Sequence, residues 1–319
     1  AEKRAIAFGV ATTIAPLLLG IACGLAFGYA VIPAIVIGSL LASHTLLSLP
    51  IITRLGADRL EPVVVAIGAT VVSDTLSLIV FAICLSSYTT GFSVSGLLIQ
   101  LVEIAVFVPL ILVGVSRAGA YLLNQAAENE EAHFVIMLGI MAVSGMLADL
   151  INLPGIVGAF LAGLSVNAAV QGRPAREKLE FFGRALFIPS FFIVTGFLIA
   201  PVAFAQSLAN DFPLVVGIIG ALLFGKWVAA EMMGRAFGYT APARLTVWAL
   251  TLPQVAATLA ATLVAYDTRN AAGQRLLDST MLNVVLVLML VTAILGPVLT
   301  ERFTSRMIGQ TRQAQKAPI

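Results

Sequence analysis

Charged residues are scarce in this sequence: Asp, Glu, Lys and Arg make up 11% of its 319 residues, whereas hydrophobic residues make up 60%. A soluble domain keeps about a quarter of its residues charged. With a mean hydropathy of +1.03, the composition therefore excludes a water-soluble protein. The net charge of only +2 also argues against a nucleic-acid partner.

Cysteine and histidine are equally rare, with two of each. Cys23 and Cys84 lie in apolar runs, where cysteine usually behaves as a small hydrophobe, so we assign them no role. His133 follows acidic residues at a membrane boundary and is expected to be solvated. The sequence shows no nucleotide-binding loop, metal-ligand cluster or nucleophile and base pair, so we expect neither enzyme chemistry nor a cofactor.

Long apolar runs, in contrast, recur along the whole chain. Each is long enough for a hydrocarbon core of about 30 Å, and short polar or Gly/Pro-marked turns separate them. The sequence predicts an all-α polytopic membrane protein with ten spans, at residues 5–28, 33–54, 62–87, 96–116, 132–150, 154–170, 185–205, 212–235, 244–266 and 279–300.

Basic residues predict the orientation of these spans, because Lys and Arg in short loops favour the cytoplasmic side. Of the 18 Lys and Arg residues, only Arg269 and Arg275 fall on the poorly charged side, and Lys226 lies inside a span. Both ends of the chain are therefore expected to face the cytoplasm.

Two spans contain groups that interrupt a helix at mid-membrane. In the first, Pro50 follows a polar triplet made of Ser43, His44 and Thr45. In the second, Pro253 lies between Thr251 and Gln254. Proline removes a backbone donor and crowds the preceding turn, and free backbone at that depth is tolerated only where it lines a cavity or is buried in protein. For His44 we favour an interior side chain with satisfied hydrogen bonds over a pH sensor.

Each interrupted span is followed by a charged loop and an uninterrupted span. The two units run in opposite directions across the membrane, as in the inverted repeats with which many secondary transporters build a midplane site. The alternative is two ordinary proline-kinked helices.

Two ionisable residues, Asp74 and Lys226, lie near the centre of their spans, where such residues are costly and usually functional. Asp74 stands between the hydroxyls of Ser73 and Thr75, which with freed carbonyls could bind a small alkali cation. Proton and cation would compete for this one site, which is the chemistry of cation exchange. Alternatively, Asp74 and Lys226 neutralise each other or compensate half-helix dipoles.

Six segments resemble the monovalent cation:proton antiporters, in the Kef-type and bacterial sodium/proton exchanger branch: ASHTLLSLPIITRLG, GATVVSDTLSLIVFA, IVGAFLAGLSV, FIPSFFIVTGFLI, GKWVAAEMMGRAFGYT and WALTLPQVAATLAATLVAY. The resemblance implies a homodimer in a bacterial inner membrane that exchanges Na+ or K+ for protons by an elevator-type movement. It places the essential carboxylate on Asp74, the basic residue of the facing helix on Lys226, and the crossing of two discontinuous helices near Thr45 and Pro253.

The same resemblance divides the chain into functional parts. Core transport helices would occupy 1–95 and 211–300, a linker helix and loop 96–131, scaffold or dimerisation helices 132–210, and a cytoplasmic tail 301–319. The motif GAFLAGL occurs only once, at residues 158–164, so about three N-terminal helices of the family pattern are expected to be missing.

Ser73 stands where electrogenic members of the family carry an acid and many electroneutral members an Asn, and we expect electroneutral exchange. The sequence leaves the choice among Na+, K+ and Li+ open. Two other functions remain: an organic-anion symporter of similar fold, with Lys226 serving the anion, and a non-transporting membrane sensor or regulatory module.

Overall fold

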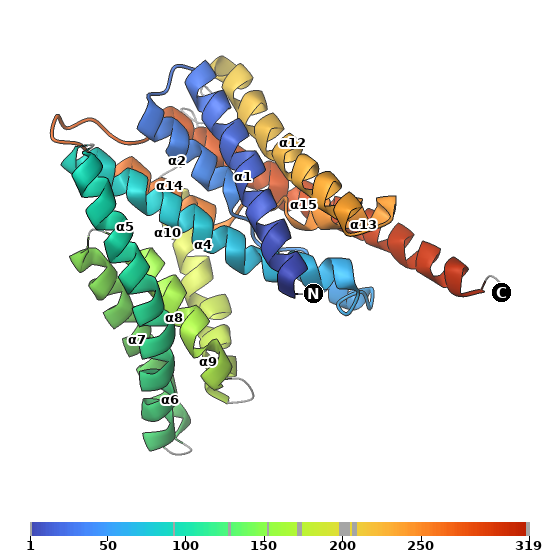
Figure 1. Ribbon diagram of the computed structural model, residues 1–319, viewed down its shortest axis with the longest axis horizontal. Helices are drawn as coiled ribbons and strands as arrows, with labels where there is room; N and C mark the ends of the chain where they lie inside the picture. Colours follow the sequence, from blue (N-terminus) through green and yellow to red (C-terminus); the bar gives the residue numbers. More distant parts are fainter. Residues whose placement is uncertain are drawn as a thin grey trace. The chain divides into compact units, whose positions relative to one another are not determined.

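The computed structural model describes residues 2–91, 93–126, 129–151, 153–170, 174–197, 205 and 209–316, and most of these residues are helical. The chain divides into two compact units. Unit 1 comprises 1–84 and 205–319, and unit 2 comprises 85–204. Figure 1 shows the helices of both units.

The first part of unit 1 contains α1 (Glu2–Ala26), α2 (Val31–Ala42), α3 (Leu49–Arg54) and most of α4 (Glu61–Thr90). A long helix is thus followed by a helix in two pieces and by a second long helix.

The last part of unit 1 repeats this order with α12 (Phe212–Ala236), α13 (Ala241–Leu250), α14 (Ala256–Asp267) and α15 (Ser279–Lys316). In both parts the two short helices together replace one predicted span. The discontinuous helices expected from the sequence are therefore present.

Among the described residues, six helices are long and apolar enough to cross a membrane, and they include α1, α4, α12 and most of α15. Shorter apolar helices comprise α2, α14 and residues 155–166. The described helices fall in all ten predicted spans, so the all-α polytopic fold class is confirmed. The last predicted span ends at residue 300, and α15 continues beyond it to Lys316.

An internal repeat marks the turn after each first helix. The tetrapeptide Ala-Phe-Gly-Tyr occurs at 26–29 and again at 236–239. In each copy the glycine has a positive φ, +84° at Gly28 and +76° at Gly238, which glycine adopts without a steric penalty. The tyrosine N–H that follows donates back into the helix end, as in a Schellman motif. The two parts therefore share sequence as well as order.

Small residues let the helices of unit 1 approach closely. A Cβ on Gly38 would clash with the Leu17 carbonyl oxygen of α1, and one on Gly225 would lie 2.7 Å from the Cα of Pro16. Figure 1 shows α1 beside α2 and α12. Close backbone approach is how membrane helices gain packing energy where lipid offers no hydrophobic driving force.

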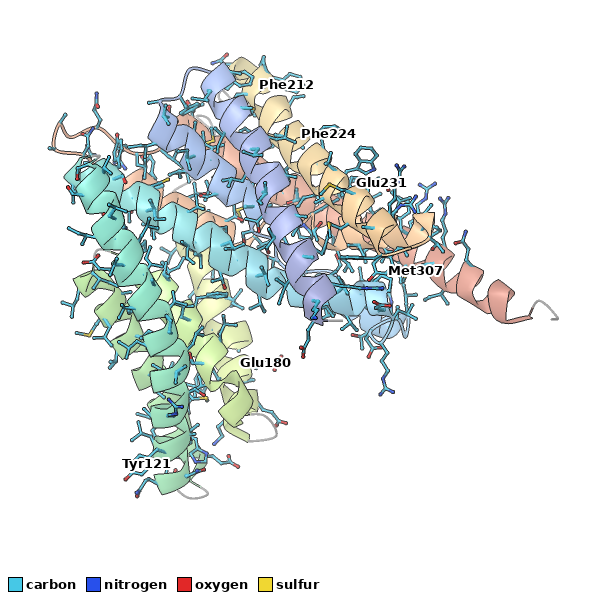
Figure 2. The ribbon with its side chains drawn as sticks, in the orientation of Figure 1. Tyr121, Glu180, Phe212, Phe224, Glu231 and Met307 are labelled. Atoms are coloured by element: carbon cyan, nitrogen blue, oxygen red, sulfur yellow. The ribbon has the colours of Figure 1, made fainter. Side chains whose placement is uncertain are left out.

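Large apolar side chains cover the outside of unit 1. Phe212 and Phe224 of α12 are 57% and 55% exposed, which suits a surface in hydrocarbon. Figure 2 labels both residues along this helix. Near the end of the same helix, Glu231 forms ion pairs of 2.8 Å with both Arg235 and Arg244. This charged cluster marks the end of the apolar surface along α12.

Unit 2 contains the end of α4 followed by α5 (Val94–Pro109), η1 (Leu110–Val115) and α6 (Ser116–Gln125), which form one continuous helix with a π-helical turn. The Ser165 hydroxyl donates to the Ile111 carbonyl oxygen at 3.1 Å. The same hydroxyl lies 2.6 Å from the Leu161 carbonyl oxygen of its own helix, so its one proton is shared between that helix and the π-helical turn.

The remaining helices of unit 2 are α7 (Glu130–Leu150), α8 (Gly155–Val170), α9 (Pro174–Phe182), η2 (Gly183–Phe187) and α10 (Ile188–Phe197). Part of the predicted span at 185–205, residues 198–204, lies outside the described residues.

The expectation that His133 is solvated is wrong. The side chain of His133 is 4% exposed, and its Nε2 lies 2.8 Å from the Leu123 carbonyl oxygen. It packs inside unit 2 because α6 and α7 contact each other and place this carbonyl beside the imidazole.

Candidate ion-binding site

Two helix breaks interrupt the helices of unit 1. In the first, α2 ends at Ala42 and α3 begins at Leu49, with Pro50 in its first turn. Proline is tolerated there because the first turn of a helix needs no internal donor. Pro253, in contrast, lies inside the second break, between α13 and α14. The first helix is therefore interrupted by the residues before Pro50 and not by Pro50 itself.

The two breaks contact each other directly. The backbone N–H of Thr45 donates to the Pro253 carbonyl oxygen at 2.8 Å. In return, the Gln254 side-chain amide donates to the Ser43 carbonyl oxygen. Backbone groups that neither half-helix satisfies are thus paired across the crossing, which explains how broken helices persist at this depth.

Asp74 of α4 faces the first break. Its Oδ1 accepts hydrogen bonds from the Ser43 hydroxyl at 2.7 Å and from the backbone N–H of His44 at 3.3 Å. A partly buried carboxylate therefore meets the interrupted helix at the point where this helix crosses the second one. The side chains of Ser43 and Asp74 come together although 31 residues separate them in the chain.

His44 is an interior side chain, as the sequence favoured. It is 1% exposed, and its ring lies between two hydroxyls of α4, with Nε2 at 3.0 Å from Thr70 Oγ1 and Nδ1 at 3.1 Å from Ser73 Oγ. Ser73 therefore points toward the imidazole.

Two other predicted site hydroxyls donate to carbonyls of the helix that contains or directly precedes them, since Thr75 lies in α4 and Thr251 follows the last residue of α13. Thr75 Oγ1 donates to the Val71 carbonyl oxygen at 2.7 Å, and Thr251 Oγ1 donates to the Trp248 carbonyl oxygen at 2.9 Å. A role for Ser73 and Thr75 in binding an ion stays a prediction.

Lys226 of α12 is fully buried, and its ammonium group donates to two backbone carbonyls. One belongs to Ala42, the last residue of α2, at 2.7 Å, and the other to Thr12 of α1, at 3.1 Å. Pro16 stands four residues after Thr12 and has no N–H, so it cannot make the usual helical bond to Thr12. Lys226 therefore supplies donors where a helix end and a proline remove them.

The second repeat copies the contact between Asp74 and His44 with a different side chain. The backbone N–H of Gln254 donates to Thr292 Oγ1 of α15 at 3.1 Å. Gln254 follows His44 by the 210 residues that separate the two Ala-Phe-Gly-Tyr turns. Thr292 stands 13 residues after the start of α15, as Asp74 stands 13 residues after the start of α4. A neutral hydroxyl thus occupies the position of the carboxylate.

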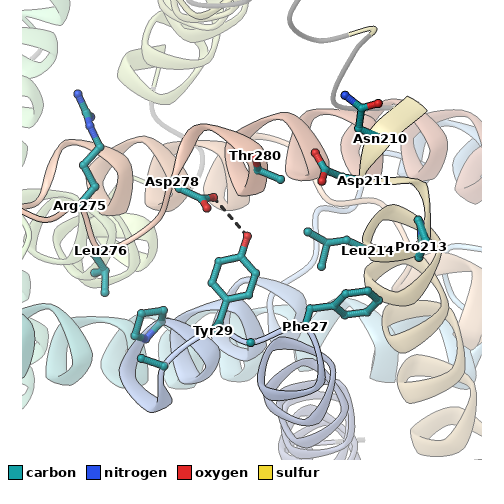
Figure 3. Close-up of a pocket in the computed structure, with 13 residues that line it drawn as sticks. Phe27, Tyr29, Asn210, Asp211, Pro213, Leu214, Arg275, Leu276, Asp278 and Thr280 are labelled. Atoms are coloured by element: carbon teal, nitrogen blue, oxygen red, sulfur yellow. Dashed lines mark hydrogen bonds between the residues drawn. The ribbon is translucent and has the colours of Figure 1, made fainter.

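A pocket of about 570 Å³ lies where α1 ends and where α12 and α15 begin. Figure 3 shows Asp211, Arg275 and Asp278 among its lining residues, with the Tyr29 hydroxyl donating to Asp278 Oδ1 at 3.2 Å. Burial raises the pKa of Tyr29, and the charge of Asp278 raises it further. Tyr29 therefore stays protonated and serves as a donor near neutral pH.

Two repeats with crossing breaks around a carboxylate are the architecture of secondary transporters. The chain belongs to the sodium/hydrogen exchanger family, because the model for the transmembrane part of that family matches residues 1–304.

Three similar proteins are named as antiporters. The chain is 45% identical over 306 residues to the Na+/H+ antiporter NhaS5 of Synechocystis, covering 96% of this chain and 44% of that protein. It is 29% identical to a Na+/H+ antiporter of Enterococcus hirae, with coverage of 68% and 57%, and 25% identical to the Na+/H+-K+ antiporter GerN of Bacillus cereus, with coverage of 73% and 60%. The chain thus spans about half the length of these relatives.

Sequence reasoning missed several residues that complete this site. Thr70, Thr292 and the carbonyl of Thr12 each bond a residue that the sequence singled out. The repeated Ala-Phe-Gly-Tyr turn carried a usable signal, because aligning its two copies pairs His44 with Gln254 and Pro16 with Lys226.

Proposed function

We propose that the chain exchanges a monovalent cation for protons, with Asp74 binding the two in turn. The observation that supports this most is the position of the Asp74 carboxylate against the first helix break, where Ser43 and His44 donate to one of its oxygens. A carboxylate so placed offers charge and hard oxygen donors to an alkali cation, and a protonated carboxyl group offers no charge.

The proposed cycle follows from competition at one group. A proton and a cation cannot both occupy the ionised carboxylate, so each displaces the other. If unit 1 changes the side to which Asp74 opens only when the group is neutralised, transport in one direction requires transport in the other. The two breaks would move as one body, because Thr45 is hydrogen-bonded to Pro253 and Ser43 to Gln254.

Lys226 fits a positioning role in this proposal. Its two carbonyl bonds hold the end of α2 against α1, next to the residues that contact Asp74. Because Lys226 is fully buried and these bonds use two of its three N–H donors, the geometry does not favour the alternative in which Lys226 binds an organic anion.

The proposal extends to the whole protein. We expect a homodimer in a bacterial inner membrane, with both ends of this chain cytoplasmic, in which the helices of 1–95 and 211–300 move against scaffold helices of 132–210. The names of the relatives support both Na+ and K+ as cargo. Labelling of single cysteines at residues 3 and 312 from each side of sealed vesicles tests the orientation.

The decisive experiment measures collapse of a pH gradient in proteoliposomes on addition of Na+, K+ or Li+. The parent should respond to at least one cation and Asp74→Asn to none, since the amide keeps the size but loses the charge. Asp58→Asn, at an exposed carboxylate in the loop before α4, is the matched control and should exchange like the parent. A folded Asp74→Asn variant with parental exchange would refute the proposal.

Electroneutral exchange is the finer part of this proposal, because one carboxylate alternates between one proton and one cation. A membrane potential imposed on the same vesicles should leave the exchange rate unchanged. Acceleration by the potential would mean that net charge crosses in each cycle.

A further inference from the structure

A small cavity of about 10 Å³ is lined in part by Ser43 and Ser77, which both bond Asp74. That is about the size at which a cavity holds one water molecule. Its lining includes four hydroxyl side chains from α2, the first break, α4 and α14, namely Ser39, Ser43, Ser77 and Thr258, each at most 5% exposed. Apolar side chains, Phe81 among them, complete the wall.

Two of these hydroxyls donate to Asp74. Ser43 Oγ donates to the carboxylate at 2.7 Å, and Ser77 Oγ donates to the backbone carbonyl oxygen of the same residue at 3.0 Å. A serine hydroxyl has one proton and two lone pairs. Both protons therefore point to Asp74, and what these groups still offer is lone pairs.

The other two hydroxyls also donate their protons to protein oxygens. Ser39 Oγ donates to the Val36 carbonyl oxygen at 2.7 Å, and Thr258 Oγ1 donates to the Gln254 side-chain oxygen at 2.6 Å. All four hydroxyls of the wall thus give their protons to protein oxygens. The polar part of the wall presents acceptors, which attract a cation and offer no hydrogen bond to an anion.

We infer that this cavity is a second binding position next to Asp74, which receives a partly dehydrated monovalent cation before or after the cation contacts the carboxylate. The inference rests on the proposed function and adds the residues that replace water around the ion, as oxygen dipoles do in selectivity filters. Ser43 links the two positions, because its proton stays on Asp74 while its lone pairs face the cavity.

The test compares the apparent KM for Na+, K+ and Li+ in the proteoliposome assay among three variants. Ser77→Ala and Thr258→Val each remove one cavity oxygen and should raise the KM of the transported cation about tenfold or more, as expected when an ion loses one hydrogen-bond-strength contact. The rate at saturating cation should stay near the parental rate. Thr262→Val is the matched control, because Thr262 is buried one turn further along α14, bonds the Thr258 carbonyl oxygen and does not line the cavity.

Ser77→Cys provides a second variant if removal of a hydroxyl disturbs folding. It keeps nearly the same shape and places a soft sulfur where a hard oxygen stood, so it should also raise KM. KM values within about twofold of the parent in Ser77→Ala, Thr258→Val and Ser77→Cys would overturn the inference while the exchange function stands. An equal loss of maximal rate with every cation, at unchanged KM, would also overturn it, because the cavity would then hold a proton-relaying water.

A binding measurement separates this inference from the proposed function. If the parent moves no protons, the proposed exchange fails, and the cavity is judged by the rise in melting temperature that each cation causes in the purified protein. A rise in the parent that is lost in Ser77→Ala and kept in Thr262→Val supports the cavity as a cation site. No rise in the parent, or an equal rise in all, refutes it.

Discussion

The two repeats of unit 1 place their helix breaks at matching positions but present different side chains to them. In the first repeat, the N–H of His44 meets the carboxylate of Asp74; in the second, the N–H of Gln254 meets the hydroxyl of Thr292. Both oxygens satisfy a backbone donor that the break exposes, so that structural task needs no charge. The carboxylate in the first repeat is therefore available for function.

A second difference lies in the first helix of each repeat. Pro16 in α1 and Lys226 in α12 each stand 14 residues after the helix begins. The proline removes a donor, and the lysine from the other repeat supplies one to the carbonyl left unpaired, that of Thr12. The two repeats thus complement each other at this position, so they differ at a second pair of matched residues.

Replacing the carboxylate at position 74 with a hydroxyl makes the first repeat resemble the second and should have the largest effect. Asp74→Thr should abolish cation-driven collapse of a pH gradient, because a hydroxyl can still accept from His44 but carries no charge. Thr292→Val should leave exchange close to the parental rate. Recovery of exchange in the double variant Asp74→Thr/Thr292→Asp would show that the two positions are interchangeable and would contradict the asymmetry.

Lys226→Met should cause the next largest effect, a loss of about 2–6 kcal/mol in the free energy of unfolding, since two buried carbonyls lose their donors at about 1–3 kcal/mol each. Chemical denaturation in detergent measures this. Pro16→Ala restores an N–H to Thr12, so it should stabilise Lys226→Met more than it stabilises the parent, with a coupling of about 1 kcal/mol. Equal stabilisation of the parent and of Lys226→Met would mean that Pro16 and Lys226 are not coupled through the Thr12 carbonyl.

His44→Gln makes the first break resemble the second and should have a moderate effect. The glutamine loses at least one of the two ring contacts to Thr70 and Ser73, at a cost of about 1 kcal/mol in unfolding free energy. Exchange and its pH profile should persist, because the backbone N–H that meets Asp74 is retained. A shifted pH profile would instead identify the imidazole as a titrating sensor.

Tyr29→Phe should have the smallest effect, a loss of about 1 kcal/mol from the hydrogen bond to Asp278. Because the folded-state pKa of Tyr29 is raised above its ordinary value of 10.0, its contribution is fully present below pH 10 and declines as the pH rises toward the folded-state pKa. Unfolding free energies of parent and variant, compared at pH 7 and above pH 10, should therefore converge at high pH. A constant difference would mean that the phenol does not titrate.

Much of this fold follows from local sequence. Low charge and ten long apolar runs are enough to predict helices that cross a membrane, because each hydrocarbon-facing segment must satisfy its own backbone. The helix breaks were also predictable, from Pro253 and from the polar triplet at 43–45. The residue at which α15 ends could not be predicted in this way. The apolar pattern stops before the helix does, because the polar segment that follows continues as helix to Lys316.

Local sequence is enough to predict that Asp74 is a carboxylate within an apolar span and that two helices are interrupted. The partners of Asp74 depend on tertiary packing: they are Ser43 and the backbone of His44, whereas the adjacent Ser73 and Thr75 bond elsewhere. Consecutive residues on a helix point in different directions, so neighbours in sequence do not share a face. The contacts of Lys226 and the acceptor-lined cavity likewise depend on residues brought together from distant helices, which no local pattern specifies.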